Sequence, residues 1–199
     1  MTTPSRPGIT HAELMALPIL RYGGPIHLVA GETDLRSAWN AIRRERVVGF
    51  DTETRPTFRR GQSYPPSLVQ LATSKAVYLF QLASLTCSEV IADALGNAHL
   101  IKAGISVGHD LKQLGLSFPI QPVNMLELDA VAKRHGYPQT GVRNLAGIFL
   151  GGRITKSVQT SNWAQAHLTK TQQVYAATDA WICRELFLRF ERQGLLSDN

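Results

Sequence analysis

Two acids in the stretch "VVGFDTETRP", residues 47–56, have the spacing of a catalytic pair. Asp51 and Glu53 stand two residues apart, so on an extended strand both carboxylates point to the same side. Two like charges this close raise each other's pKa unless a cation lies between them. Carboxylate oxygens suit hard ions such as Mg²⁺ or Mn²⁺. The structural alternative is that one acid caps a turn while the other faces solvent.

Three further residues could contribute to the same chemistry. Tyr175 and Asp179 are four residues apart in a segment with helical periodicity, so they share one helix face. Asp110 follows His109 where a short helix is expected to begin, and His109 could be a ligand or a general base. Each has a structural alternative. Asp179 could be a surface acid beside a core tyrosine, Asp110 a helix cap, and His109 a turn residue.

A mixed sheet is predicted to position these side chains. Short apolar runs indicate strands at 25–30, 47–51, 67–73, 76–82 and 99–105, and 123–136 reads as a strand running into a helix. Further helices are expected at 31–47, 88–96, 108–116, 141–150, 162–167 and 169–192. The turn residues Ser74 and Lys75 indicate a hairpin. An antiparallel meander followed by alternating strands and helices predicts an α/β fold with a mixed five-stranded sheet flanked by helices.

Composition limits the domain organisation and the class of partner. Residues 26–199 are enough for one compact domain, whereas residues 1–25 hold four prolines and are expected to be an irregular lead-in. Lys and Arg outnumber Asp and Glu by 21 to 15, which gives a formal net charge of +6. This balance favours a polyanionic partner such as nucleic acid.

Cysteine usage and hydropathy indicate the expected compartment. Cys87 and Cys183 match no close metal-ligand spacing and no disulfide framework, which favours a reduced environment in which both are small apolar fillers. No apolar run approaches the roughly 18 residues that a membrane span needs. The N-terminus lacks the continuous apolar core of a secretory signal, so we expect a cytoplasmic protein without a membrane partner.

Taken in chain order, these acids resemble a known constellation. An acid pair on a central strand, an acid opening a middle helix and a late Y-x-x-x-D resemble the DEDDy branch of the 3′–5′ exonuclease superfamily, particularly ribonuclease D and the Werner syndrome exonuclease domain. The resemblance covers roughly residues 26–192 and includes S-N-W at 161–163 and L-T-x-x-Q-x-x-Y at 168–175. The sister DEDDh branch carries a histidine five residues before the last acid. Val174 stands there, so the tyrosine branch fits.

The resemblance implies a ribonuclease H-like fold and a two-metal mechanism. Two Mg²⁺ or Mn²⁺ ions would hydrolyse phosphodiester bonds at the 3′ end of single-stranded DNA or RNA and release nucleoside 5′-monophosphates. On this pattern Asp51 bridges both ions, Glu53 and Asp179 hold the ion that carries the attacking water, and Asp110 serves the other ion mainly through water. Tyr175 orients the attacking water, because a group with a pKa near 10 is a poor base at neutral pH.

Substrate binding is expected to come from the surroundings of the acids. Phosphate contacts from basic groups and stacking of bases would give sequence-tolerant binding of a single strand. Trp163 is expected to pack in the core rather than to touch substrate. The candidate substrate-binding residues are Thr52, Thr54, Arg55, Arg59, Arg60, His109, Arg143 and Lys156.

Two other functions are weighed against the exonuclease. A catalytically inactive nucleic-acid-binding module on the same fold is disfavoured because no acid is missing. An unrelated nucleotide-binding domain lacks support, since neither G-x-G-x-x-G nor G-x-x-x-x-G-K-[ST] follows a predicted strand. The sequence leaves the choice between DNA and RNA, and the oligomeric state, open.

Overall fold

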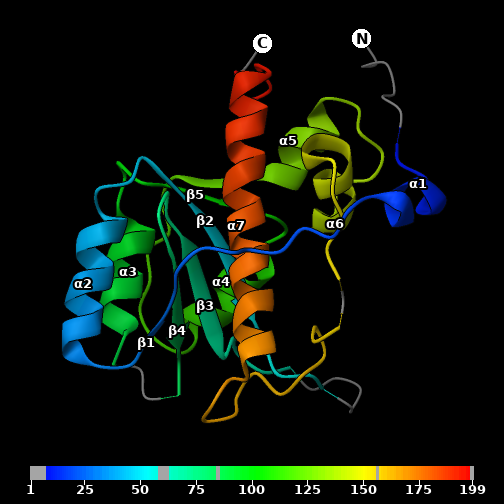
Figure 1. The fold of residues 1–199 in the computed structure, drawn as a ribbon. Coiled ribbons are helices and arrows are strands. Elements are labelled where there is room, and N and C mark those ends of the chain that lie inside the picture. The colour runs from blue at the N-terminus through cyan, green and yellow to red at the C-terminus, as the bar shows by residue number, and fades with distance from the viewer. Residues whose placement is uncertain (1–7, 58–62, 84–85, 156, 198–199) are drawn as a thin grey trace.

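The computed structural model describes residues 8–57, 63–83, 86–155 and 157–197, which form a mixed sheet between two layers of helices (Figure 1). The strand order is β1-β4-β3-β2-β5-β6. The strands are β1 Ile26–Val29, β2 Val47–Glu53, β3 Leu68–Ala72, β4 Val77–Gln81, β5 Ile101–Gly104 and β6 Met125–Glu127.

The sheet combines an antiparallel meander with parallel strands, as predicted. β2, β3 and β4 are antiparallel neighbours, while β1 runs parallel to β4 and β5 and β6 run parallel to β2. The predicted count of five strands is one too low. The sixth strand is β6, which is only three residues long and continues directly into a helix, as expected for residues 123–136.

Helices cover both faces of the sheet. One face packs against α2, α3 and α4, and the long helix α7 crosses the other face together with α5 and α6 (Figure 1). None of the described helices is long and apolar enough to cross a membrane. The helices are α1 His11–Ala16, α2 Glu32–Ile42, α3 Ser88–Gly96, α4 Gly108–Gly115, α5 Leu128–Arg134, α6 Val142–Leu145 and α7 Lys170–Arg192, with a π-helical turn at Ala146–Leu150.

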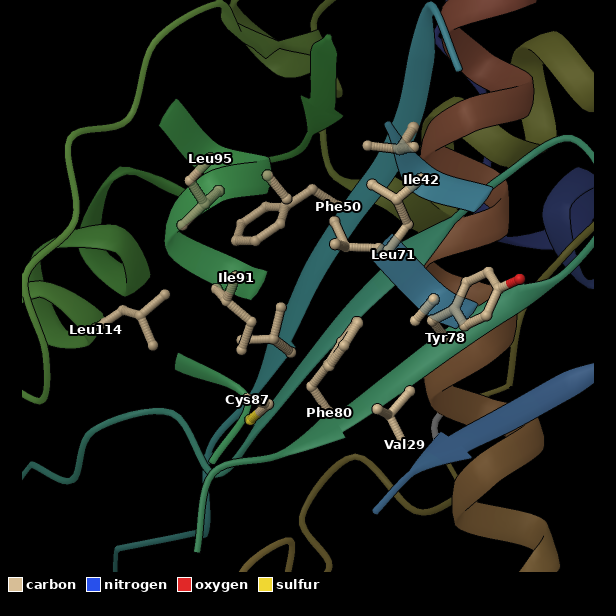
Figure 2. Packing of buried hydrophobic residues seen from close by; sticks show 14 of the residues in the cluster. Val29, Ile42, Phe50, Leu71, Tyr78, Phe80, Cys87, Ile91, Leu95 and Leu114 are labelled. Atoms are coloured by element: carbon tan, nitrogen blue, oxygen red, sulfur yellow. The ribbon is translucent and has the colours of Figure 1, made fainter. Parts of the chain in front are cut away.

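One apolar layer lies between the sheet and helices α2, α3 and α4 (Figure 2). Phe50 of β2 and Phe80 of β4 are fully buried there against Ile91 and Leu95 of α3. Burial of each such side chain contributes about 1.5–3 kcal/mol. Apolar packing in this layer therefore holds the central strands in place, and the acids of β2 do not have to contribute to that packing.

Three expectations about irregular segments need correction. Residues 141–150 are helical, but the second half is a π-helical turn that ends at Gly151, whose φ is 65°. Residues 162–167 form turns instead of a helix. The lead-in at 1–25 is not wholly irregular, because it contains α1, where Thr10 and Glu13 form a reciprocal capping box.

Helix α7 approaches strand β2 unusually closely at Gly49. A methyl group added at Gly49 would overlap the carbonyl oxygen of Ala180 and lie 2.8 Å from the backbone nitrogen of Arg184. Only glycine permits this separation, since the opposing atoms belong to a helix backbone that cannot move aside by itself. The close approach sets the height of α7 above the C-terminal end of β2.

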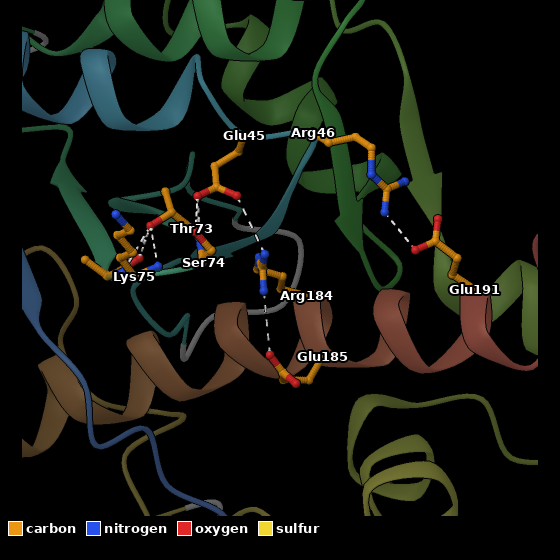
Figure 3. A network of polar contacts seen from close by, with 9 residues as sticks. Glu45, Arg46, Thr73, Ser74, Lys75, Arg184, Glu185 and Glu191 are labelled. Atoms are coloured by element: carbon orange, nitrogen blue, oxygen red, sulfur yellow. Dashed lines mark hydrogen bonds and ion pairs between the residues drawn. The ribbon is translucent and has the colours of Figure 1, made fainter.

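A polar network fixes the second half of α7 to the start of β2 and to the β3–β4 turn (Figure 3). The Glu45 carboxylate accepts hydrogen bonds from the backbone nitrogen and the hydroxyl of Ser74, at 2.9 and 2.5 Å, and lies 3.6 Å from Arg184. Arg46 and Glu191 form a second ion pair at 2.7 Å. The Glu45 and Arg184 side chains are largely buried, so this pair is less screened than a surface ion pair.

We expect Gly49→Ala to destabilise the protein by about 1–3 kcal/mol, because the added methyl group must push α7 away from β2. Urea unfolding followed by circular dichroism measures the change. Gly23→Ala is the matched control, since a methyl group there meets no atom within 4 Å. Equal unfolding midpoints for the two variants would contradict the close packing of α7 on β2.

Candidate active site

Three acids converge where β2 ends under α7. Asp51 and Glu53 project from the same face of β2, and Asp179 reaches them from α7. Ligand oxygens of all three lie within 4.8 Å of one another. Glu53 and Asp179 are buried, and Asp51 is half-buried. The structure thus brings together three of the four acids singled out in the sequence.

Burial and mutual repulsion raise the pKa of each clustered carboxyl. Burial, with the charge of Asp179 added, raises the pKa of Asp51 well above its ordinary value. Burial and neighbouring Asp51 raise the pKa of Glu53 to about 10. Burial raises the pKa of Asp179 to about 7, and a polar contact with Tyr175 partly offsets this. Without a cation, the three carboxyls therefore cannot all be ionised at neutral pH.

One buried carboxylate oxygen in this cluster lacks a hydrogen-bond partner among the described residues, which bears on whether a cation fits there. Oδ1 of Asp179 is buried and has no hydrogen-bond partner among the described residues. Leaving such a group unsatisfied costs free energy, and coordination to a metal ion removes that cost. Three convergent carboxylates with an unpaired oxygen form the hard donor set that Mg²⁺ and Mn²⁺ prefer.

Tyr175 lies one turn before Asp179 on α7 and is half-buried. Burial and the charges of Asp179 and Glu53 raise the pKa of the Tyr175 phenol. Its ring lies 6.0 Å from the ring of Trp163, centroid to centroid. Trp163 is fully buried, which confirms the expected core position, and its Nε1 donates to the carbonyl of Gln159 at 3.3 Å.

The S-N-W and L-T-x-x-Q-x-x-Y segments have a common structural purpose. Thr169 caps α7 by accepting a hydrogen bond from the backbone nitrogen of Gln172 at 3.2 Å. The buried Gln172 amide donates to the Ser161 hydroxyl at 3.0 Å and to the Asn162 carbonyl at 3.3 Å. These bonds tie the preceding loop to the first turn of α7, three residues before Tyr175. These two segments therefore hold the backbone of the helix turn that leads to Tyr175.

Asp110 lies in the first turn of α4 and is not part of the 4.8 Å cluster. Burial raises its pKa, while nearby Thr52 and the exposed His109 lower it. The charge of Asp110 in turn raises the pKa of Asp51, so the two carboxyls are electrostatic neighbours. The Thr52 hydroxyl is buried and lacks a well-aligned hydrogen-bond partner among the described residues. The fourth acid thus stands beside the cluster, at a greater distance.

Two acids that the sequence analysis did not single out hold the turn before α4. Ser106 adopts a positive φ of 55°, and its backbone nitrogen and hydroxyl donate to Asp129 at 3.2 and 2.9 Å. The backbone nitrogen of Val107 donates to Glu127 at 3.2 Å. Glu127 and Asp129 therefore position the helix that carries Asp110. Their only sequence signal was two acids at the end of a short apolar run.

The remaining predicted substrate contacts have diverse positions. Thr54 is half-buried just after β2. The Arg55 guanidinium packs 3.4 Å from the centroid of the Tyr64 ring, which gives it a structural contact. Arg143 lies on α6, and its Nε is buried without a partner in the described part of the chain. Three predicted contacts lie outside the described residues, namely Arg59, Arg60 and Lys156.

Two neighbours of the acids were missed as parts of the site. Gln70 is fully buried and stands opposite Asp51 in the β2–β3 register, with its Oε1 unpaired. A polar residue inside the apolar run "SLVQLAT" was the available signal. Cys183 lies one turn beyond Asp179, and burial and the charges of the acids raise the pKa of its thiol. The thiol is therefore protonated beside the carboxylates.

Comparison with known proteins places this geometry in a family. A model of the 3′–5′ exonuclease family matches residues 26–194. The exonuclease mut-7 homolog of Homo sapiens is 29% identical over 199 residues, which cover 85% of this chain and 22% of that protein. The bifunctional 3′–5′ exonuclease/ATP-dependent helicase WRN of Mus musculus is 32% identical over 141 residues, covering 68% of this chain and 10% of that protein. The chain thus spans a small part of either relative.

Solved structures agree on the architecture. The EXO domain of Aedes aegypti Nibbler superposes with a TM-score of 0.74 at 26% identity and covers 84% of this chain and 88% of that domain. Escherichia coli RNase D superposes with a TM-score of 0.73 at 23% identity, covering 86% of this chain and 46% of that one, and supports the fold alone. The sheet and its helices thus form the predicted ribonuclease H-like fold. The chain belongs to the DEDDy family of 3′–5′ exonucleases.

Proposed function

We propose that this chain is a metal-dependent exonuclease that removes nucleoside 5′-monophosphates from the 3′ end of single-stranded nucleic acid. The observation that carries the proposal is the convergence of Asp51, Glu53 and Asp179, with one buried oxygen unpaired, in a chain of this family. A basic net charge of +6 supports a polyanionic substrate. Proteins of this family use divalent ions, and Mg²⁺ or Mn²⁺ are the ions proposed here.

The acids would hold the metal ions. Asp51, Glu53 and Asp179 offer hard oxygens from two rigid elements, and Asp110 would contribute from α4 through water. Divalent ions bound there would lower the pKa of a water molecule and neutralise negative charge on the phosphate. Because β2 and α7 are fixed to each other at Gly49, the carboxylates are held in place before substrate arrives.

Tyr175 would orient the attacking water as a hydrogen-bonding group. Burial and the neighbouring acids favour its neutral phenol, so it has a proton to donate and accepts through its oxygen. A neutral phenol with a raised pKa is a poor general base at neutral pH. Its contact with Trp163 and the anchored first turn of α7 would keep the hydroxyl directed at the site.

The choice between RNA and DNA is the finer part of the proposal. A solved structure of Trypanosoma brucei RNase D in complex with RNA U12 has the same fold, with a TM-score of 0.74 at 18% identity. That protein binds RNA on this fold, which supports a nucleic-acid substrate, and we propose that this chain accepts RNA. Protein contacts with the 2′-hydroxyl would decide against DNA. Matched DNA and RNA strands, degraded side by side, test that preference.

We expect Asp51→Asn to abolish stepwise shortening of a 5′-labelled single strand in Mg²⁺ or Mn²⁺. The loss in rate should be at least about 100-fold, the scale of losing one strong electrostatic contact to a transition state. Asp93→Asn, at an exposed position on α3, is the matched control and should remain active. A wild-type protein that binds the strand without shortening it in either metal would favour the inactive-module alternative.

We expect Tyr175→Phe to lower kcat by about 100-fold, the typical cost of a misplaced reactant, while KM stays near its wild-type value. The phenylalanine keeps the ring contact with Trp163 and removes only the hydroxyl. Steady-state kinetics on a single labelled strand separates the two constants. Tyr78→Phe, which alters a tyrosine of the opposite apolar layer, is the control. Unchanged kcat in Tyr175→Phe would rule out a role for the hydroxyl.

The raised pKa values predict how the metal-free protein responds to pH. The pKa of Asp179 is raised from 3.8 to about 7 and that of Glu53 from 4.5 to about 10, so the folded state binds more protons than the unfolded state in these intervals. Stability in a chelator should therefore fall as pH rises from about 5 to 8. Saturating Mn²⁺ should reduce the fall, because the ion stabilises the ionised carboxylates.

Thermal unfolding across this pH range, with and without chelator, measures the effect. Asp179→Asn removes one raised pKa and should flatten the fall in chelator, whereas Asp93→Asn should leave it unchanged. A melting temperature in chelator that is independent of pH for the wild-type protein would argue against the close, buried packing of the acids.

A further inference from the structure

A cavity of about 180 Å³ lies beside the acid cluster, and the family match does not account for one of its walls. Tyr175 and Asp179 of α7 line it on the catalytic side. Thr155 and Ser157, from the loop before α7, line another side. The remaining wall comes from Leu20 and Arg21, which precede the matched residues 26–194.

Residues 17–25, here called the N-terminal strap, cross α7 next to this cavity (Figure 1). The backbone nitrogen of Leu20 donates to the carbonyl of Arg153 at 2.8 Å, and that of Tyr22 donates to the Thr178 hydroxyl at 3.0 Å. The Tyr22 ring lies 5.9 Å from the Trp181 ring. Both neighbours of Arg21 are thus anchored, and the backbone of Arg21 is held in place.

Close packing on the strap's inner side supports this placement. A Cβ atom at Gly152 would lie only 2.7 Å from Cδ2 of Leu20, so glycine makes room for the strap. The backbone nitrogen of Arg153 also donates to the carbonyl of Pro18 at 2.9 Å. The strap is therefore held against the rest of the domain by backbone hydrogen bonds and close packing, and it forms a fixed wall of the cavity.

The charge distribution in the cavity suits an anion with an apolar body. Arg21 and Lys170 both line it, and neither has a salt-bridge partner within the described ranges. Lys170 begins α7, whose N-terminal dipole also favours negative charge. Leu20 and Val174 add apolar surface on which a sugar or base can rest. Arg21 and Lys170 would attract a phosphate group, whereas the neighbouring acids would bind divalent ions.

We propose that the N-terminal strap is part of the substrate-binding site and that Arg21 binds a phosphate group of the nucleic-acid strand next to the cleaved bond. The inference rests on the proposed nuclease function and extends it to a segment outside the family match. The strap residue supplies a charge-assisted hydrogen bond, and the hydroxyls of Thr155 and Ser157 supply neutral donors on the facing loop.

The test compares Arg21→Ala, Arg21→Lys and the control Arg36→Ala. Arg36 is exposed on α2, where it pairs with Glu32, so its replacement removes the same charge from the surface away from the cavity. Arg21→Ala should raise KM for a labelled single strand about 10-fold, the scale of one charge-assisted hydrogen bond, with kcat nearly unchanged. Arg21→Lys should restore most of the affinity. Arg36→Ala should match the wild-type protein.

A second measurement does not depend on catalysis. In an Asp51→Asn background, fluorescence anisotropy of a labelled single strand is measured over a range of salt concentrations. Arg21→Ala should weaken binding and lower the slope of log affinity against log salt by about 1. Identical affinity and slope for Arg21→Ala and Arg36→Ala would overturn the proposal.

The two measurements separate failure of the inference from failure of the proposed function. A wild-type protein that cleaves nothing refutes the nuclease proposal, and the anisotropy comparison still decides whether Arg21 binds phosphate. A wild-type protein that cleaves while Arg21→Ala keeps its KM and salt slope refutes the strap proposal alone.

Discussion

The separation between α7 and β2 is the constraint on which the site depends. At Gly49 the backbones approach so closely that a single methyl group would overlap the helix. That approach places Asp179 beside Asp51 and Glu53, which project from the same strand two and four residues later. The ion pair of Glu45 with Arg184 holds the next part of the helix. Packing therefore determines the electrostatics, since a more distant helix would leave the carboxylates hydrated and separate.

The acids could be found from the sequence because the spacing within each pair matches the period of the strand or helix that carries it. A period of two on β2 and of four on α7 places Asp51 with Glu53, and Tyr175 with Asp179, on common faces. The antiparallel pairing of β3 with β4 followed from the hairpin predicted at residues 74–75. The strand expected at the start of 123–136 is present as β6, but the predicted count of five left the sheet one strand short, and β6 pairs with β5 over only three residues.

The rest of the site depends on contacts between distant segments, which no local period reveals. Glu127 and Asp129 hold the turn that presents Asp110, and Gln70 meets Asp51 only through strand register. The strap reaches α7 across more than 150 residues of sequence, through Tyr22 and Thr178. Proline-rich composition indicated an irregular lead-in at 1–25, yet its described part contains α1, and the backbone that follows α1 is held by hydrogen bonds to distant segments.

The buried thiol one turn beyond Asp179 bears on which metals the protein would accept. Thiolate is the soft ligand that draws zinc and copper into protein sites, and it must lose its proton to bind. At Cys183, burial and the surrounding negative charge oppose that loss. Among the described residues, Cys183 is thus a sulfur next to the acids that burial, with their charge added, keeps protonated in the metal-free protein. The donors that the described residues bring together at this point are therefore the carboxylate oxygens of Asp51, Glu53 and Asp179, next to a neutral sulfur.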